Sequence, residues 1–354
     1  MSEIEVTTTL NPEIKEAAIS YVKKLFSQSE DSKLIRVLKK ESFKRVYKKM
    51  VLEPDEFRPK PRPAGVEPWH GNKPDGPRDF LKSKVVLPSL PQVLLQIQQV
   101  INDSGSSAND LAEVISKDPK LVASILRLAN SALFSFRTEV DTPTRAVALL
   151  GFKQAGSLAL ATVTLSLFKR SKGTSVLEVE KFWKHSIACG VIAQEIAKAA
   201  DLGDPERFFV GGMLHDIGLY VIFETSASLA LEILDLAKQK GDCLYNAEQE
   251  LLGFNHAILG GIIIKDWNFP HPLVVAAAGH HNPEKARNDP DAGVVHIADF
   301  ISRALGYDLG GAAVLGKIEP AAWDKIGISG NFFIEKLPEI QDMIDTIFEI
   351  LNPE

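Results

Sequence analysis

The stretch GGMLHDIGL, residues 211–219, sets a histidine beside an aspartate within an otherwise apolar run. The dipeptide Asp204-Pro205 comes shortly before it and is typical of a helix start, so we expect a helix that continues past His215. His215 and Asp216 would then lie on one helix and could bracket the same ion. An unpartnered polar group buried among apolar side chains costs roughly 2–7 kcal/mol, so this pair needs partners from elsewhere in the chain.

Polar side chains interrupt the apolar faces of other predicted helices in the same way. Six of the eight histidines lie between residues 185 and 281. The further interruptions are His185 in FWKHSIACG, His256 in FNHAILGG, the doublet His280-His281 in AAAGHHNP, and Asp299 in VVHIADFIS. A single buried histidine bonded to a backbone carbonyl is common in protein cores, but five such settings together favour a shared metal site.

The ligand types in these settings indicate which metals would bind. Neutral imidazole and carboxylate together suit divalent transition metals, with iron or manganese expected first and zinc or nickel as alternatives. Two ions a few ångströms apart can trap a hydroxide and clamp a phosphate between them. An aspartate is a natural bridge, because each of its two oxygens can bind one ion. We therefore expect two metal ions.

Apolar residues recur at helical spacing almost throughout the chain beyond residue 80, and period-two runs are nearly absent. The fold class is therefore predicted to be all-α, as a bundle of many helices. Ser107 with Asp110 resembles a capping box, and Thr142-Pro143 is a second start signal. Predicted helices cover residues 107–116, 118–131, 142–151, 154–168, 177–200, 204 to beyond 215, 246–253, 256–267, 272–281, 291–305 and 331–351.

The N-terminal region differs from the rest in charge and composition. Residues 15–50 hold eleven Lys/Arg against four Asp/Glu, with apolar residues at helical spacing, so a basic helical extension is predicted over residues 1–53. It is either an arm that meets nucleic acid, an anionic membrane or an acidic partner, or a pair of helices that packs on the body. Seven prolines in residues 54–77 predict an extended, proline-rich linker over residues 54–80, which leaves residues 81–354 for the main domain.

Composition excludes several classes of protein. The chain has 354 residues, of which 45% are hydrophobic, so it can bury a core, and its net charge of -6 is too mild to indicate a partner. Two cysteines cannot build a disulfide scaffold. The start MSEIEV lacks the features of a signal peptide, and the longest charge-free run, residues 85–102, contains two prolines and four glutamines. We therefore expect a cytoplasmic protein without a transmembrane segment.

Residues 85–310 resemble an HDOD domain, a member of the HD superfamily of metal-dependent phosphohydrolase-like folds in bacterial signalling. The motifs that carry the resemblance are LPSLPQVLLQIQQVI, ISKDPKLVASILRLANSALF, AVALLGFKQAGSLAL and GGMLHDIG. The resemblance implies a helical N-terminal half over residues 81–175, an HD-like metal-site half over 176–310 and C-terminal helices over 311–354.

The resemblance also implies which residues bind metal. The positions that match the H…HD…D ligands of the first ion are His185, His215, Asp216 and Asp299. The positions that would hold a second ion, as in the related HD-GYP phosphodiesterases, are His256, His280 and His281. Asp216 would bridge the two ions and would be the catalytic ligand of an active enzyme.

The sequence departs from the HD-GYP pattern, and two functions therefore remain open. Leu219 stands where those enzymes have a lysine, their Gly-Tyr-Pro motif has no counterpart, and their HHE is His280-His281-Asn282 here. One function is a bacterial signal-transduction output module that binds a dinuclear metal centre and acts through a signalling protein partner. The alternative is a metal-dependent phosphohydrolase or phosphodiesterase that acts on a nucleotide or other phosphoester through a metal-bridging hydroxide.

A few further polar residues are candidates for supporting roles. The candidates for phosphate contact are Lys184, Lys265 and Arg303. Each of them could equally be an exposed solubilising charge. His296 shares a helix face with Asp299 and is either a support for the metal ligands or a hydrogen-bonded core histidine. His70 and His271, which lie beside prolines, receive no role.

Overall fold

The computed structural model describes residues 10–57, 66–71, 73–84, 90–167, 176–287, 289–308 and 314–351. Within these ranges every regular element is a helix, which confirms the predicted all-α class. The N-terminal elements are α1 (Pro12–Leu25), α2 (Lys33–Leu52), the 3-10 helix η1 (Pro54–Phe57), α3 (Pro77–Lys84), α4 (Gln92–Asn102), α5 (Ala108–Ser116), α6 (Pro119–Ala129), α7 (Pro143–Leu150) and α8 (Phe152–Leu167).

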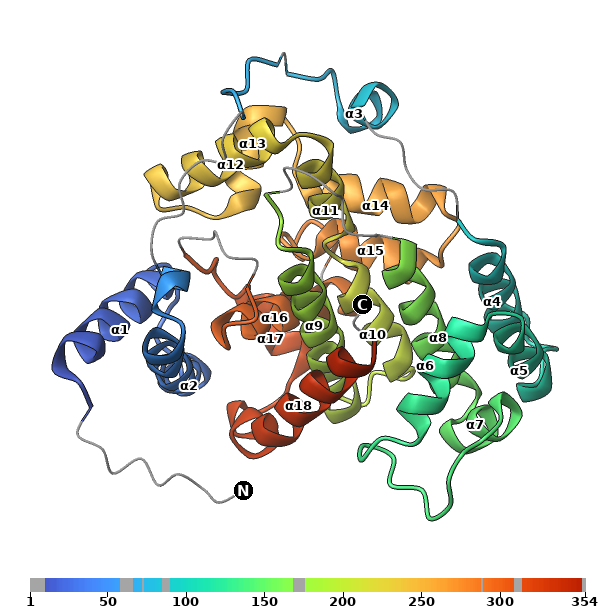
Figure 1. Ribbon diagram of the computed structural model, residues 1–354. Helices are drawn as coiled ribbons and strands as arrows, with labels where there is room; N and C mark the ends of the chain where they lie inside the picture. Colours follow the sequence, from blue (N-terminus) through green and yellow to red (C-terminus); the bar gives the residue numbers. More distant parts are fainter. Residues whose placement is uncertain are drawn as a thin grey trace.

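The C-terminal part of the chain forms ten further helices among the described residues. They are α9 (Val179–Ala199), α10 (Pro205–Leu214), α11 (Ile217–Thr225), α12 (Ala227–Lys240), α13 (Leu244–Leu252), α14 (His256–Asp266), α15 (His271–Gly279), α16 (Pro290–Ala304), α17 (Pro320–Ile326) and α18 (Gly330–Leu351). Helix α9 runs through the middle of the bundle, with α4–α8 on one side and α1, α2 and α16–α18 on the other (Figure 1).

Helix starts that the sequence predicted are formed by the expected side chains. Ser107 and Asp110 form a capping box at α5, in which the Ser107 amide donates to Asp110 Oδ2 at 2.8 Å. Asp118 accepts from two backbone amides at the start of α6, and the Thr142 hydroxyl accepts from the Arg145 amide at α7. These bonds satisfy amides that have no partner inside the helix, so local chemistry fixes where these helices begin.

The structure corrects the prediction that one helix carries both His215 and Asp216. Helix α10 ends at Leu214 and α11 begins at Ile217, so the pair occupies the junction between them. The Asp216 carbonyl accepts from the Leu219 and Tyr220 amides and begins α11. The break places His215 directly after α10 and Asp216 directly before α11, so the turn between the two helices sets the direction of both side chains.

Four helices lie outside the predicted set, namely α3, α4, α12 and α17. Helix α3 begins at Pro77, inside the predicted linker, because a proline is well suited to the first helical position. The predicted end of the 154–168 helix and residues 58–65 and 72 of the predicted linker lie outside the described residues. The division into three domains therefore stays a prediction.

The N-terminal helices are not separate from the bundle. Ala18 and Val22 of α1 and Leu38 of α2 belong to the same cluster of buried apolar residues as Phe300 and Ile344. Helix α2 contacts both α16 and α18. Helices α1 and α2 therefore match the second alternative proposed from the sequence, a pair of helices that packs on the main domain.

Among the described residues, one unbent helical segment is apolar and long enough to cross a membrane by length and composition. It is Pro205–Thr225, which contains α10 and α11, and 89% of its most hydrophobic window is buried inside the bundle. Such burial is typical of a central helix in a folded domain.

Candidate metal centre

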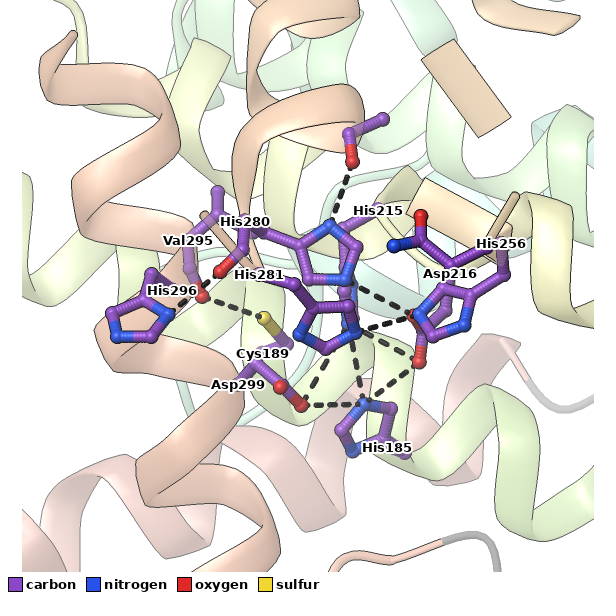
Figure 2. A network of polar contacts seen from close by, with 12 residues as sticks. His185, Cys189, His215, Asp216, His256, His280, His281, Val295, His296 and Asp299 are labelled. Carbon is purple, nitrogen blue, oxygen red and sulfur yellow. Dashed lines mark hydrogen bonds and ion pairs between the residues drawn. The ribbon is translucent and has the colours of Figure 1, made fainter. Parts of the chain in front are cut away.

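Seven polar side chains from five separate parts of the chain converge at one buried point (Figure 2). His185 comes from α9, Asp299 from α16, and His215 with Asp216 from the junction of α10 and α11. The remaining three are His256, at the first position of α14, and the doublet His280-His281, directly after α15. The structure therefore brings together all seven residues that the sequence proposed as metal ligands.

One group in this cluster consists of His185, His215 and Asp299, whose ligand atoms lie within 4.8 Å of one another. Asp299 Oδ1 lies 3.3 Å from His185 Nε2 and 3.8 Å from His215 Nε2. Asp216 Oδ2 faces the same two histidines, at 3.4 Å from His185 Nε2 and 3.3 Å from His215 Nε2. Two imidazoles and two carboxylate oxygens thus surround a single point.

The other group consists of Asp216, His256, His280 and His281, again with ligand atoms within 4.8 Å of one another. Here the second oxygen of Asp216 faces the histidines: Oδ1 lies 3.1 Å from His256 Nε2 and 3.5 Å from His280 Nε2. His281 Nε2 lies 2.8 Å from His256 Nε2. Each group could hold a metal ion, and Asp216 turns one oxygen toward each group.

Hydrogen bonds at Nδ1 orient four of the five imidazoles. His185 Nδ1 lies 2.7 Å from the Tyr307 carbonyl oxygen, and the corresponding atoms of His215 and His280 lie 2.6 Å from Gly212 O and 2.7 Å from Ala277 O. The fourth Nδ1 atom, that of His256, lies 2.7 Å from a carboxylate oxygen of Glu248. Because a carbonyl or carboxylate can only accept, each Nδ1 carries a proton, and each ring directs its Nε2 toward the centre.

The donor set fits a cation better than it fits the protein alone. Asp216 Oδ1 and His280 Nε2 are buried and make no hydrogen bond with any described residue. Burial lowers the pKa of His280 to about 4, despite the nearby Asp216 carboxylate, so His280 Nε2 keeps its lone pair at neutral pH. His281 and His256 point Nε2 atoms at each other. Two Nε2 atoms at this distance need either a proton or a cation between them, because two facing lone pairs repel each other.

The carboxylates of the cluster favour positive charge around them. Burial lowers the pKa of an imidazole, but Asp216 and Asp299 outweigh burial and raise the pKa of His185 to about 9. In the same way, Glu248 and Asp216 raise the pKa of His256 to about 10. Divalent cations would supply the positive charge that these two histidines otherwise provide by taking up protons.

Two glycines of the GGMLHDIG stretch allow the surrounding helices to approach this point. A Cβ atom at Gly212 would lie 2.8 Å from the Cys189 carbonyl oxygen of α9, and one at Gly218 would lie 2.1 Å from the His256 carbonyl oxygen of α14. Real Cβ atoms essentially never come so close to backbone. The missing side chains therefore let α10 pack against α9 and α11 against α14, which sets the distance from Asp216 to His185 and His256.

The three candidates for phosphate contact have different outcomes. Arg303 lines the pocket that opens onto the centre, and its Nη1 lies 3.9 Å from Asp299 Oδ2. Lys184 instead pairs with Asp345 of α18 at 2.9 Å and does not line the pocket. Lys265 is exposed on α14 and does not line the pocket. Of the three, the structure brings only Arg303 to the centre.

His296 proves to be both a hydrogen-bonded core histidine and a support for a ligand. Its Nδ1 lies 2.6 Å from the His280 carbonyl oxygen, and its Nε2 accepts from the Glu319 amide at 2.9 Å. It thereby ties the His280-His281 doublet to the segment before α17. Figure 2 shows its ring lying to one side of the five converging imidazoles.

Sequence reasoning missed Glu248 and Tyr245, both on α13. Glu248 is fully buried and accepts from both the backbone amide and Nδ1 of His256, at 2.7 Å each. The Tyr245 ring stacks on His281 with centroids 4.3 Å apart and an interplanar angle of 22°. The sequence does contain a sign of Glu248. In the run LYNAEQELL it lies four residues from both Leu244 and Leu252, which places a charged residue on the apolar face of the helix.

The Glu248→Gln variant is expected to weaken binding of the ion held by His256 about 10- to 100-fold, because a neutral amide holds Nδ1–H less firmly and lowers the basicity of Nε2. Metal titration followed by calorimetry would measure this change. The ion held by His185, His215 and Asp299 should bind as in the wild type. Equal weakening of both ions would contradict the assigned role of Glu248.

The fold and the site together define an all-α protein with a buried histidine–aspartate centre of the kind that could hold metal ions. A model of the HDOD domain family matches residues 87–283, which is more than half of the chain. The chain belongs to the HDOD family, as the sequence motifs predicted.

Solved structures and a curated protein resemble this chain. An HDOD domain protein of unknown function from Geobacter sulfurreducens matches with a TM-score of 0.64 and 23% identity, over 77% of this chain and 96% of that chain. A candidate phosphohydrolase from Shewanella amazonensis SB2B matches with a TM-score of 0.63 and 26% identity, over 78% and 97%. An uncharacterized protein of Treponema pallidum is 24% identical over 62% of this chain, and this match spans 42% of that protein.

Proposed function

We propose that this protein is a bacterial signal-transduction module of the HDOD type whose metal-site half binds two divalent transition-metal ions. The single observation that carries the proposal is the orientation of Asp216. Its Oδ2 faces His185 and His215, whereas its Oδ1 faces His256 and His280. Two cations that share this carboxylate would each use one of its oxygens, and iron or manganese suits these nitrogen and oxygen ligands best.

In this proposal the ions act mainly as a structural link between helices. The ligands come from α9, the α10–α11 junction, α14, the end of α15, and α16, so binding orders five segments at once. A change in occupancy would therefore alter how these helices pack and which surface a signalling protein partner meets. A candidate signal transduction protein from Marinobacter aquaeolei VT8 has a similar fold, with a TM-score of 0.56 and 21% identity over 75% of this chain. The protein is expected to work in the cytoplasm.

Elemental analysis tests the proposal directly. We expect two divalent ions per chain in protein purified without chelator, and a thermal midpoint that falls when a chelator removes them. The fall follows because a ligand that binds only the folded state adds about 4 kcal/mol of stability at 1,000 times its Kd. A chain with no bound metal, and with a midpoint that added manganese, iron or zinc leaves unchanged, would refute the proposal.

A second candidate function is metal-dependent hydrolysis of a nucleotide or other phosphoester, and the position of Arg303 favours it. Arg303 and Tyr245 line the pocket above the cluster, together with Asp216 and His281. When bound, two ions would supply Lewis-acid activation of water and of phosphate oxygens. The Arg303 guanidinium, held near Asp299 at 3.9 Å, could donate hydrogen bonds to a phosphate oxygen at the mouth of the pocket.

If the protein is such an enzyme, the metal-loaded form should hydrolyse p-nitrophenyl phosphate or its diester at ordinary enzyme rates, about 1–1,000 per second. The Arg303→Ala variant should then raise KM about 10- to 100-fold, because it removes a charged hydrogen bond to phosphate that is worth about 1.5–3 kcal/mol. The matched control is Lys265→Ala, which removes a cation that does not line the pocket. Metal-loaded protein without turnover would leave the signalling module as the sole candidate.

A further inference from the structure

One arginine of the N-terminal helix pair makes polar contacts with the metal-site half. Arg45 of α2 donates from Nη1 to the Leu305 carbonyl oxygen at 3.0 Å and from Nη2 to the Tyr307 hydroxyl at 3.2 Å. Its guanidinium also lies 4.8 Å from the centroid of the Tyr307 ring. Leu305 is the residue that ends α16, so Arg45 places a positive charge on the carbonyl end of the helix that carries Asp299.

Tyr307 in turn holds a proposed metal ligand. Its backbone carbonyl oxygen lies 2.7 Å from His185 Nδ1 and is the nearest acceptor for that proton. The Ser302 hydroxyl oxygen is farther away, at 3.2 Å, and donates its own proton to the Asp299 carbonyl oxygen. Tyr307 is 7% exposed, so its side chain has little freedom to move. Arg45 and His185 therefore contact the same residue, Arg45 through the Tyr307 side chain and His185 through the Tyr307 carbonyl.

Other contacts fix the helix pair against the same region. The Leu315 amide donates to the Leu25 carbonyl oxygen at the end of α1, at 2.7 Å. The rings of Phe26 and Phe300 meet edge to face with centroids 6.2 Å apart. Phe300 follows Asp299 directly, so the helix pair braces the ligand-bearing helix at two points. Helices α1 and α2 lie outside residues 87–283, which the HDOD family model matches.

We propose that Arg45 is a positioning residue for the ion held by His185, His215 and Asp299, and that helices α1 and α2 thereby set how tightly this ion binds. The inference rests on the proposed metal binding. Without Arg45, the turn at Leu305–Tyr307 loses two hydrogen bonds and a ring contact, and the carbonyl that fixes His185 loses its anchor. In the second group, Glu248 orients His256 and the Ala277 carbonyl orients His280, so neither contact involves Tyr307.

The test compares the affinities for the first and the second metal ion in the unchanged chain and in three variants of helix α2. Arg45→Ala should lower the affinity for the first ion about 10-fold or more, as expected when a metal ligand loses an outer hydrogen-bond partner. The affinity for the second ion should not change. Arg45→Lys, which keeps the charge but cannot make both hydrogen bonds, should recover part of the loss. The matched control Lys44→Ala removes an adjacent cation that pairs only with Glu41.

Tyr307→Phe separates a positioning role from a merely structural one. It removes the hydroxyl that binds Arg45 but keeps the carbonyl that binds His185. The variant should lower the affinity for the first ion. Adding Arg45→Ala should then lower this affinity by less than it does in the wild type, because both changes break the same connection. Wild-type affinity for both ions in Arg45→Ala, or equal weakening of both, would overturn the inference.

Nuclear magnetic resonance of the metal-free chain tests the inference independently of metal binding. The His185 ring should be protonated at Nδ1 in the wild type, with a hydrogen-bonded proton signal that Arg45→Ala shifts or broadens. If the wild type binds no metal, the proposed function fails and this signal still decides whether Arg45 positions His185. An unchanged His185 signal in the variant would overturn the inference even if two ions bind.

Discussion

Replacing Asp216 by asparagine is expected to remove both metal ions from the protein. Each carboxylate oxygen faces a different pair of histidines, at 3.1–3.5 Å. Histidines 215 and 256 hold the pKa of the Asp216 carboxyl well below its usual range despite its burial, so it is charged at neutral pH. Asparagine keeps the shape but loses that charge, and we expect both affinities to fall by more than about 100-fold, beyond the loss typical of an outer-sphere partner. Elemental analysis would measure the change.

Asp299→Asn is the matched control for this prediction. The Asp299 carboxylate contacts His185 and His215, with Arg303 at 3.9 Å, and it also loses one negative charge on substitution. This variant should release the first ion and keep the second. If Asp216→Asn likewise kept one ion, Asp216 would not bridge two metals and the dinuclear proposal would fail.

Replacing Gly218 by alanine is expected to destabilise the fold strongly. A Cβ at this position would lie 2.1 Å from the His256 carbonyl oxygen and 2.6 Å from the Gly260 amide nitrogen, and both of these atoms are backbone. Neither can rotate away, so α11 and α14 must separate, which should cost about 3 kcal/mol or more. In a chain of this size the thermal midpoint should drop by about 4 °C or more. Differential scanning calorimetry of the metal-free protein would measure it.

Gly293→Ala provides the comparison, because it makes the same chemical change inside the buried helix α16. A Cβ there would first meet the Ala322 Cβ at 3.4 Å, which is an ordinary contact. Alanine is favoured over glycine in a helix interior by up to about 1 kcal/mol, so this variant should be as stable as the wild type or slightly more so. A Gly218→Ala protein of equal stability would show that the two helices tolerate a wider separation.

Much of the candidate site could be predicted because its ligands are residue types that rarely interrupt apolar helices without a partner. His185, His256 and Asp299 each stood alone among hydrophobic residues, and the motif around Asp216 matched a known family. The supporting residues were harder to predict. Glu248 sits eight positions before His256, and Tyr307 acts through a backbone carbonyl that every residue possesses. No sequence pattern distinguishes such a carbonyl from the others.

The all-α class, several helix starts and the seven proposed ligands could be predicted from the sequence alone. These follow from local rules, since helical spacing, capping residues and the cost of burying polar groups depend on residue type and near neighbours. Three other features became visible in the folded chain. They are the break between α10 and α11, the direction of the two Asp216 oxygens toward different groups of histidines, and the contact of Arg45 with Tyr307. Those features depend on how closely helices far apart in the chain approach, which is set by packing at positions such as Gly218 and not by spacing along the sequence.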